Sequence, residues 1–183
     1  MGTRWLDDAQ QRSWRAYLQA SNTMWDALDR QLQRDSGINH AYYEILVTLS
    51  ETPDHQLRMS ELADGLSSSR SRLSHAVARL EERGWVERVA CPTDRRGQNA
   101  RLTEAGFAAL QEAAPGHVEA VRSVLVDALT PQQLEQLRVI SEAIVAASQA
   151  HTEREDARAD DDAPTGRAAP AGREARRPAR PSR

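Results

Sequence analysis

The chain has 183 residues, which is enough for one domain with a hydrophobic core. Hydrophobic residues make up 39% of the sequence but aromatic residues only 4%, a balance that favours helices over a β-sandwich, and the formal net charge is −3. No run of eighteen apolar residues is present, and the first ten residues lack the apolar core of a secretory signal. A single cysteine excludes an internal disulfide framework. We therefore expect a cytoplasmic protein without a membrane span.

The sequence lacks the motifs of common enzymes and metal sites. It contains no glycine-rich phosphate loop, no Gly-x-Ser-x-Gly segment and no His-Glu-x-x-His segment. The five histidines are scattered at spacings that do not match a metal site. We therefore expect no enzymatic activity, no cofactor and no metal ion.

A long helix is predicted from about Ala9 to Arg34, ending near Gly37. Its large apolar residues recur with a period near 3.5 and are Trp14, Leu18, Trp25, Leu28 and Leu32. Such a seam packs against another long helix. Two interpretations stay open, because that helix can belong to a second subunit or to the core of the same subunit.

Three short elements are expected next. The apolar positions of His40–Ser50 predict a helix, and Gln56–Met59 predicts a short strand. A further short helix should begin at Glu61, with the hydroxyl of Ser60 as its cap.

A longer helix, from about Arg70 to Arg83, follows serines 67–69, one of which is expected to cap it. Leu73, Val77 and Leu80 form one apolar stripe, which should face the core. The opposite face carries polar and cationic residues, namely Ser68, Ser71, Arg72, His75 and Arg79. Such a face suits the major groove of DNA, where arginine pairs with guanine and serine can donate or accept hydrogen bonds. The alternative is an ordinary solvated helix face.

A two-stranded ribbon is predicted after this helix. The segments Trp85–Val89 and Asn99–Leu102 alternate apolar and polar residues, as half-buried strands do. Between them, Gly97 permits a tight turn with Arg95 and Arg96 at its tip. Arginines at the tip of a ribbon can reach a minor groove of DNA. Asp94 is expected to brace one of these arginines through a charge-assisted hydrogen bond.

Positive charge is concentrated in this part of the chain. Ser67–Arg101 contains eight arginines and four acidic residues, a net charge of +4. The flanking segments Met1–Leu66 and Leu102–Ala150 together carry −8. One basic segment in an otherwise acidic protein predicts phosphate binding at that segment.

Two helices and a tail are expected at the C-terminal end. Thr103 should cap a long helix from Glu104, and Thr130 followed by Pro131 is a strong helix start. The last helix has few charges, so we expect it to join the first helix in a dimer core. From His151 the chain has no Leu, Ile, Val or aromatic residue, which predicts a disordered charged tail.

Short helix, turn, longer helix and β-ribbon is the order of elements in a winged helix-turn-helix. The expected fold class is therefore mainly α with a small antiparallel β wing, framed by N- and C-terminal dimerisation helices. The expected regions are an N-terminal dimerisation helix (1–37), the winged helix-turn-helix (38–103), C-terminal linker and dimerisation helices (104–150) and the tail (151–183).

The segment Leu80–Gly106, LEERGWVERVACPTDRRGQNARLTEAG, resembles the wing of MarR-family transcriptional regulators. His40–Leu66 resembles the lead-in to the wing in that family, and the similarity covers approximately residues 14–147. An Asp-Arg-Arg-Gly wing tip followed by Leu-Thr and a helix is a specific motif. The resemblance implies a homodimer on pseudo-palindromic double-stranded DNA, usually a repressor and often released by a small aromatic or phenolic ligand.

Roles for individual residues follow from the helix face, the wing and this resemblance. The predicted DNA-binding residues are Ser60, Ser68, Arg70, Ser71, Arg72, His75, Arg79, Asp94, Arg95 and Arg96. Of these, Ser71, Arg72 and His75 are expected at base edges. Aromatic residues on the segments that line a ligand cleft in the family are Trp14, Tyr17, His40, Tyr42 and Tyr43. For each of these five, an ordinary place in the core is the alternative.

Two other functions remain open at this point. The protein can be an architectural DNA binder without strong sequence preference, or its winged helix can be a protein-interaction module. Cys91, the only thiol, lies near arginines that can lower its pKa. We prefer a passive residue to an oxidant sensor at this position.

Overall fold

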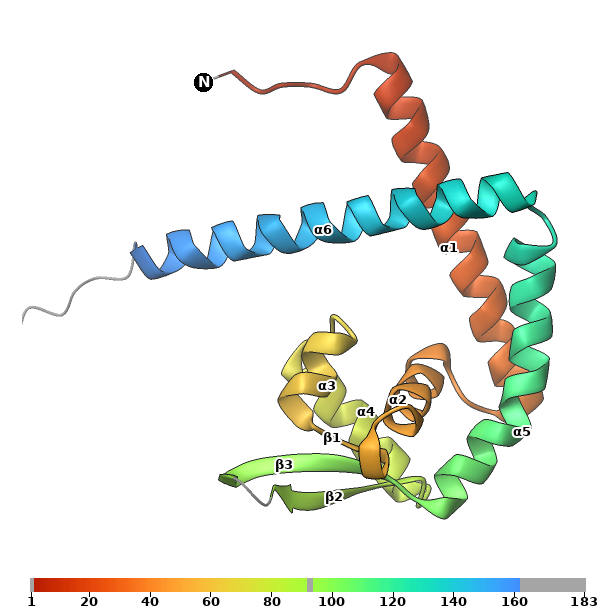
Figure 1. The fold of residues 1–183 in the computed structure, drawn as a ribbon, viewed down its shortest axis with the longest axis vertical. Coiled ribbons are helices and arrows are strands. Elements are labelled where there is room, and N and C mark those ends of the chain that lie inside the picture. Colours follow the sequence, from red (N-terminus) through yellow and green to blue (C-terminus); the bar gives the residue numbers. More distant parts are fainter. Residues whose placement is uncertain (1, 92–93, 162–183) are drawn as a thin grey trace, which may run out of the picture. The chain divides into compact units, whose positions relative to one another are not determined.

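Helices make up most of the computed structural model, which describes residues 2–91 and 94–161. The helices are α1 (Asp8–Ser36), α2 (His40–Ser50), α3 (Met59–Gly65), α4 (Arg70–Glu82), α5 (Glu104–Val121) and α6 (Pro131–Asp161). The strands are β1 (Gln56–Arg58), β2 (Val86–Cys91) and β3 (Asp94–Leu102). A 3₁₀ turn (Pro53–His55) precedes β1, and a π-helical turn (Arg122–Val126) follows α5. The expected fold class, mainly helical with a small antiparallel sheet, is confirmed (Figure 1).

The first two helices begin and end where local hydrogen bonds dictate. Asp7 and Gln10 form a reciprocal capping box at the start of α1. The helix stops at Gly37, whose left-handed backbone (φ 65°) lets its N–H donate to the carbonyl of Gln33. The Asn39 side chain then caps α2. Both helices match their predicted positions to within two residues.

The core surrounds α2, which contacts α1, α4, α5 and two of the strands. Fully buried side chains from the helices include Leu32, Leu46, Leu49, Leu62, Val77 and Leu80. The predicted seam of α1 divides into two parts. Leu28 and Leu32 are buried, whereas Trp14, Leu18 and Trp25 are exposed in this single chain. Helices α1 and α5 lie side by side over part of their length (Figure 1).

The sheet has the order β1-β3-β2 and is antiparallel throughout. Its β2–β3 ribbon is longer than predicted, because pairing continues to Cys91 opposite Asp94. The prediction that Gly97 forms the turn is therefore wrong, since Gly97 lies inside β3. A Cβ atom at Gly97 would lie 3.1 Å from Nη2 of Arg58 and 3.2 Å from Oδ2 of Asp94. Glycine leaves room there for the ion pair between these two side chains.

The serine caps were predicted correctly at one helix and wrongly at the other. Ser69 caps α4 by accepting a hydrogen bond from the backbone N–H of Arg72 at 3.2 Å. Helix α3 instead begins at Met59, after Arg58, without a side-chain cap, so the capping role given to Ser60 is wrong. The register of β1 with β3 fixes the chain up to Arg58, and the helix begins directly after it.

The chain divides into two compact units, one up to Pro131 and one from Gln132. Helix α6 begins at Pro131 as expected, and all of it after this residue belongs to the second unit. The helix continues to Asp161, so the prediction of disorder from His151 is wrong for residues 151–161. Alanine, glutamate and arginine dominate that stretch, and these residues have high helix propensity. The rest of the predicted tail, 162–183, lies outside the described residues.

Candidate functional site

The outer face of α4 is polar and solvent-exposed. Its inward side chains Leu73, Val77 and Leu80 are at most 2% exposed, which fixes the rotation of the helix. The exposed residues on the other faces include Arg70, Ser71, Arg72, His75 and Arg79, whereas Ser68 before the helix is half-buried. The predicted orientation of the helix is therefore confirmed.

The arginines of α4 differ in how they are paired. Arg79 donates to Glu82 at 2.8 Å, and this hydrogen bond raises the pKa of the guanidinium. Arg70 and Arg72 have no ion-pair partner among the residues that the structure describes. Two unpaired guanidinium groups at the N-terminal end of one exposed helix are suited to bind phosphate or base edges.

The ribbon is tied to α4 by Arg88, a residue that sequence reasoning missed. Its guanidinium donates to the Ser74 carbonyl at 2.8 Å and lies 2.8 Å from the Glu81 carboxylate. Glu81 also accepts from the backbone N–H of Arg88 at 3.1 Å. Both side chains of the ion pair are less than one third exposed. These contacts hold the β2–β3 ribbon against α4.

A double-mutant cycle of Arg88→Ala and Glu81→Ala should give a coupling free energy of about 1–2 kcal/mol in denaturant unfolding. Partial burial places the value above that of an exposed pair, for which roughly 0.2–1 kcal/mol is usual. The exposed pair Arg79 and Glu82 on the same helix is the matched control. Equal coupling in the two cycles would contradict a special role for Arg88.

A polar groove of about 470 Å³ lies between the starts of α3 and α4 and the sheet. Its lining residues are Arg58, Met59, Ser60, Arg70, Ser74, Arg88, Gly97 and Gln98. Sequence reasoning assigned Ser60 and Arg70 to phosphate contacts but missed Arg58 and Arg88. Asp94 pairs with Arg58 across the sheet, a partner that the sequence did not indicate. The neighbours of Asp94, Arg95 and Arg96, lie in β3, but their side chains are outside the described part.

Other arginines of the basic segment serve the fold. Arg83 donates to the Gly37 carbonyl at 3.1 Å, and its guanidinium lies 4.9 Å from the ring centre of Trp85. Arg101 pairs with Glu87 directly across the β2–β3 ladder at 2.8 Å. Among the basic-segment arginines whose side chains the structure describes, those without an ion pair, a side-chain hydrogen bond or a ring contact are therefore Arg70 and Arg72 at the start of α4.

A second, mostly apolar pocket of about 350 Å³ lies between α1, α2 and the α5 region. Its lining residues are Met24, Trp25, Leu28, His40, Tyr43, Glu44, Val47, Thr48, Leu66, His117, Val121, Val124 and Leu125. Of the five predicted ligand residues, only His40 and Tyr43 line it. Trp14 and Tyr17 are exposed on α1 and stack on each other at 6.2 Å, and Tyr42 packs against the core.

Two histidines meet at this pocket. The ring centres of His40 and His117 are 5.7 Å apart, and Tyr43 lies 4.4 Å from His117. His117 is 8% exposed, and its Nδ1 atom has no hydrogen-bond partner. Burial, and to a lesser degree the nearby His40, lower the pKa of His117. Both effects favour the neutral form of the imidazole. The sequence held no signal for this pair, because 77 positions separate the two residues.

Residues 2–91 and 94–161 contain neither a cluster of metal-ligating side chains nor a membrane-spanning helix. No three His, Cys, Asp or Glu side chains gather there as a metal site would require. No helix in this range is long and apolar enough to cross a membrane. Cys91 is half-buried at the end of β2.

Comparisons with known proteins agree on one family. The model of the MarR family matches residues 36–97. The transcriptional repressor MprA of Escherichia coli is 33% identical over 111 residues, which are 61% of this chain and 62% of that repressor. The chain thus spans less than two thirds of this curated relative.

Solved structures extend the match to nearly the whole of two relatives from Streptomyces coelicolor. The MarR-family regulator Sco3205, solved in complex with DNA, is 51% identical with a TM-score of 0.77, covering 79% of this chain and 91% of that one. The regulator AbsC is 39% identical with a TM-score of 0.77, covering 81% of this chain and 99% of its own. The chain therefore belongs to the MarR family of transcriptional regulators and is not an enzyme.

Proposed function

We propose that this protein is a homodimeric, sequence-specific regulator that binds double-stranded DNA and represses transcription until a small aromatic ligand releases it. The observation that carries the proposal is the exposed face of α4, where Arg70 and Arg72 are unpaired beside a polar groove and a β-ribbon. Two relatives support it, since MprA is a transcriptional repressor and Sco3205 was solved with DNA. A repressor of this kind acts in the cytoplasm, where its operator lies.

We assign the residues of this surface as follows. Ser71, Arg72 and His75 contact base edges in the major groove, with Arg79 beside them. Ser60, Ser68 and Arg70 contact phosphates that flank these bases. Arg95 and Arg96 carry the wing into the minor groove, and Asp94 holds the base of the wing through Arg58.

Exposed apolar side chains support a dimer in each of the two units. On α1, Trp14, Leu18 and Trp25 form an uncovered stripe. On α6, Ile140 and Ile144 are exposed although they are large and apolar. A helix presenting such a stripe needs a partner to cover it.

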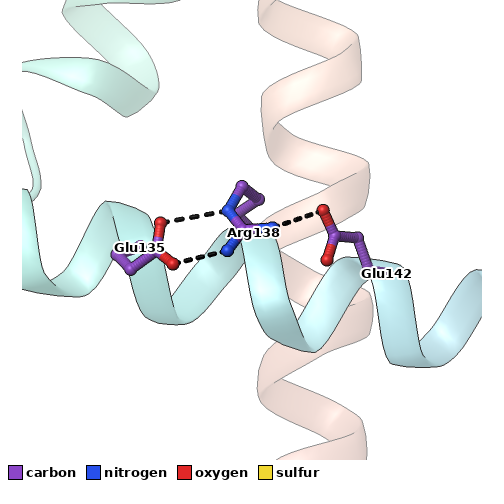
Figure 2. Close-up of polar contacts among 3 residues, drawn as sticks. All are labelled: Glu135, Arg138 and Glu142. Carbon is purple, nitrogen blue, oxygen red and sulfur yellow. Dashed lines mark hydrogen bonds and ion pairs between the residues drawn. The ribbon is translucent and has the colours of Figure 1, made fainter.

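The opposite face of α6 carries charged, solvent-exposed side chains. Figure 2 shows Arg138 held between Glu135 and Glu142, with a bidentate pair to Glu135 and a 2.6 Å contact to Glu142. At 100° per residue, this charged trio lies opposite Ile140 and Ile144. The two isoleucines and the charged trio thus lie on opposite sides of α6, and the isoleucine side is the one that a second subunit would cover.

Selection of bound fragments from the genome of origin tests the function. Sequence-specific binding predicts that the selected operator outcompetes random DNA by about a thousandfold or more in a gel shift. Equal competition by random DNA would indicate an architectural binder. Absence of any shift would favour a protein-interaction module instead.

A further inference from the structure

The charge of the apolar pocket restricts what it can bind. None of its lining residues within the described chain is an arginine, and the sequence contains no lysine. The one formally charged lining residue is Glu44, whose side chain is 47% exposed and lies 3.5 Å from Nδ1 of His40. Asp29 lies close by, because it accepts a hydrogen bond from the backbone N–H of His40 at 2.8 Å. The formal charge among the lining residues of the pocket is therefore negative.

Aromatic rings line the same pocket as Glu44. Trp25 meets His40 edge-on at 4.7 Å, and Tyr43 packs on His117. The faces of tryptophan and tyrosine attract cations, most strongly where water is excluded. The Nδ1 atom of His117 is buried and has no hydrogen-bond partner in the protein, so a ligand in the pocket can supply one.

We propose that this pocket binds a planar aromatic molecule carrying a protonated amine, with the ammonium group at Glu44 and the ring system between Trp25 and Tyr43. An aromatic carboxylate would bring a second negative charge to Glu44 with no cation of the pocket to pair with it. This proposal specifies the chemical class of the ligand in the proposed function. Binding of the amine does not depend on that function, whereas an effect of the amine on DNA binding does.

The position of Glu44 suggests how a ligand in the pocket could affect DNA binding by α4. Glu44 and Leu66 line the pocket and also a smaller neighbouring depression of about 150 Å³. The same depression is lined by Arg72 at the start of α4. A ligand that contacts Glu44 therefore binds next to a depression that is lined by Arg72 of α4, the helix assigned to the major groove.

Three probes with one ring system and different charges test the ligand class. Isothermal titration calorimetry on the full chain without DNA would compare 2-naphthylmethylamine, 2-naphthylmethanol and 2-naphthoate. The amine is expected to bind about tenfold more tightly than the alcohol, from one ion pair and one cation–π contact. The carboxylate is expected to bind more weakly than the alcohol. Equal or tighter binding of the carboxylate would overturn the proposal.

A substitution separates the charge of Glu44 from the shape of the pocket. Glu44→Gln should remove the part of the amine's advantage that comes from the ion pair, and leave only the smaller preference due to the cation–π contact. Alcohol affinity should stay within about twofold of the wild-type value, which also shows that the variant is folded. Glu51→Gln, an exposed glutamate that does not line the pocket, is the matched control and should change neither affinity. Unchanged selectivity for the amine in Glu44→Gln would exclude the assigned role of this carboxylate.

Gel shifts with the selected operator distinguish this proposal from the proposed function. Amine-selective binding without any DNA shift would support the ligand class and overturn the regulator function. A specific shift together with no amine selectivity would leave the regulator function standing and overturn the ligand class.

Discussion

Replacing Arg72 with alanine is expected to weaken binding to the selected operator by about 2–6 kcal/mol, because each protomer loses a base contact of roughly 1–3 kcal/mol. That corresponds to a loss between about 30-fold and about 20,000-fold, measured by fluorescence anisotropy at fixed salt. The advantage over random DNA should shrink as well, since a base contact carries sequence information. The melting temperature should stay unchanged, because Arg72 is exposed and has no ion-pair partner among the described residues.

Arg30→Ala is the matched control for this substitution. Arg30 is an exposed arginine of α1 with no ion-pair partner in the described range, and it lies far in sequence from α4. The control should bind the operator as the unaltered protein does. Wild-type affinity in the Arg72 variant would show that Arg72 of α4 does not contribute to operator recognition.

Gly106→Ala should destabilise the fold by about 3 kcal/mol or more, the upper range for overpacking. A Cβ atom at this position would lie 2.1 Å from the backbone carbonyl oxygen of Trp85 and 2.8 Å from Cδ1 of Leu102. The Trp85 carbonyl cannot easily move, because it accepts the backbone N–H of Thr103 at 3.0 Å. The first turn of α5 would have to move away from the start of β2, which would loosen the attachment of the wing to α5.

Thermal unfolding at fixed protein concentration measures this effect, with an expected decrease in Tm of roughly 6–12 °C. Gly65→Ala provides the comparison, since Gly65 is helical and a Cβ there would meet nothing within 4 Å. That variant should be neutral or slightly more stable, because alanine favours helices. Similar melting of both variants would show that the close approach at Gly106 is relaxed in solution.

The sequence predicted the elements that local chemistry controls. Helices α1 and α2, which the sequence placed to within two residues, begin directly after Asp7 and Asn39, whose side chains accept backbone N–H groups. The inward stripe of α4 follows from the spacing of its apolar residues alone. The sequence prediction failed at Gly97, where strand pairing continues through the residue that was expected to form the turn. The missing side chain at this position leaves space for Arg58.

The candidate site was predicted only where one helix supplies it. The exposed face of α4 needs no knowledge of other elements, so Arg70, Arg72 and His75 could be placed from the sequence. Arg88 could not be assigned to α4, because its contact with Ser74 exists only after the ribbon has folded back on the helix.

The sequence by itself determined the order of elements, the rotation of α4 and the concentration of positive charge, since each depends on neighbours within a few residues. The tertiary structure decided which of the described arginines have ion-pair partners, where the sheet register places Asp94, and which side chains form the apolar pocket. His40 and His117 come from helices that meet only in the folded chain, and burial there, rather than any motif, leaves an imidazole nitrogen without a partner.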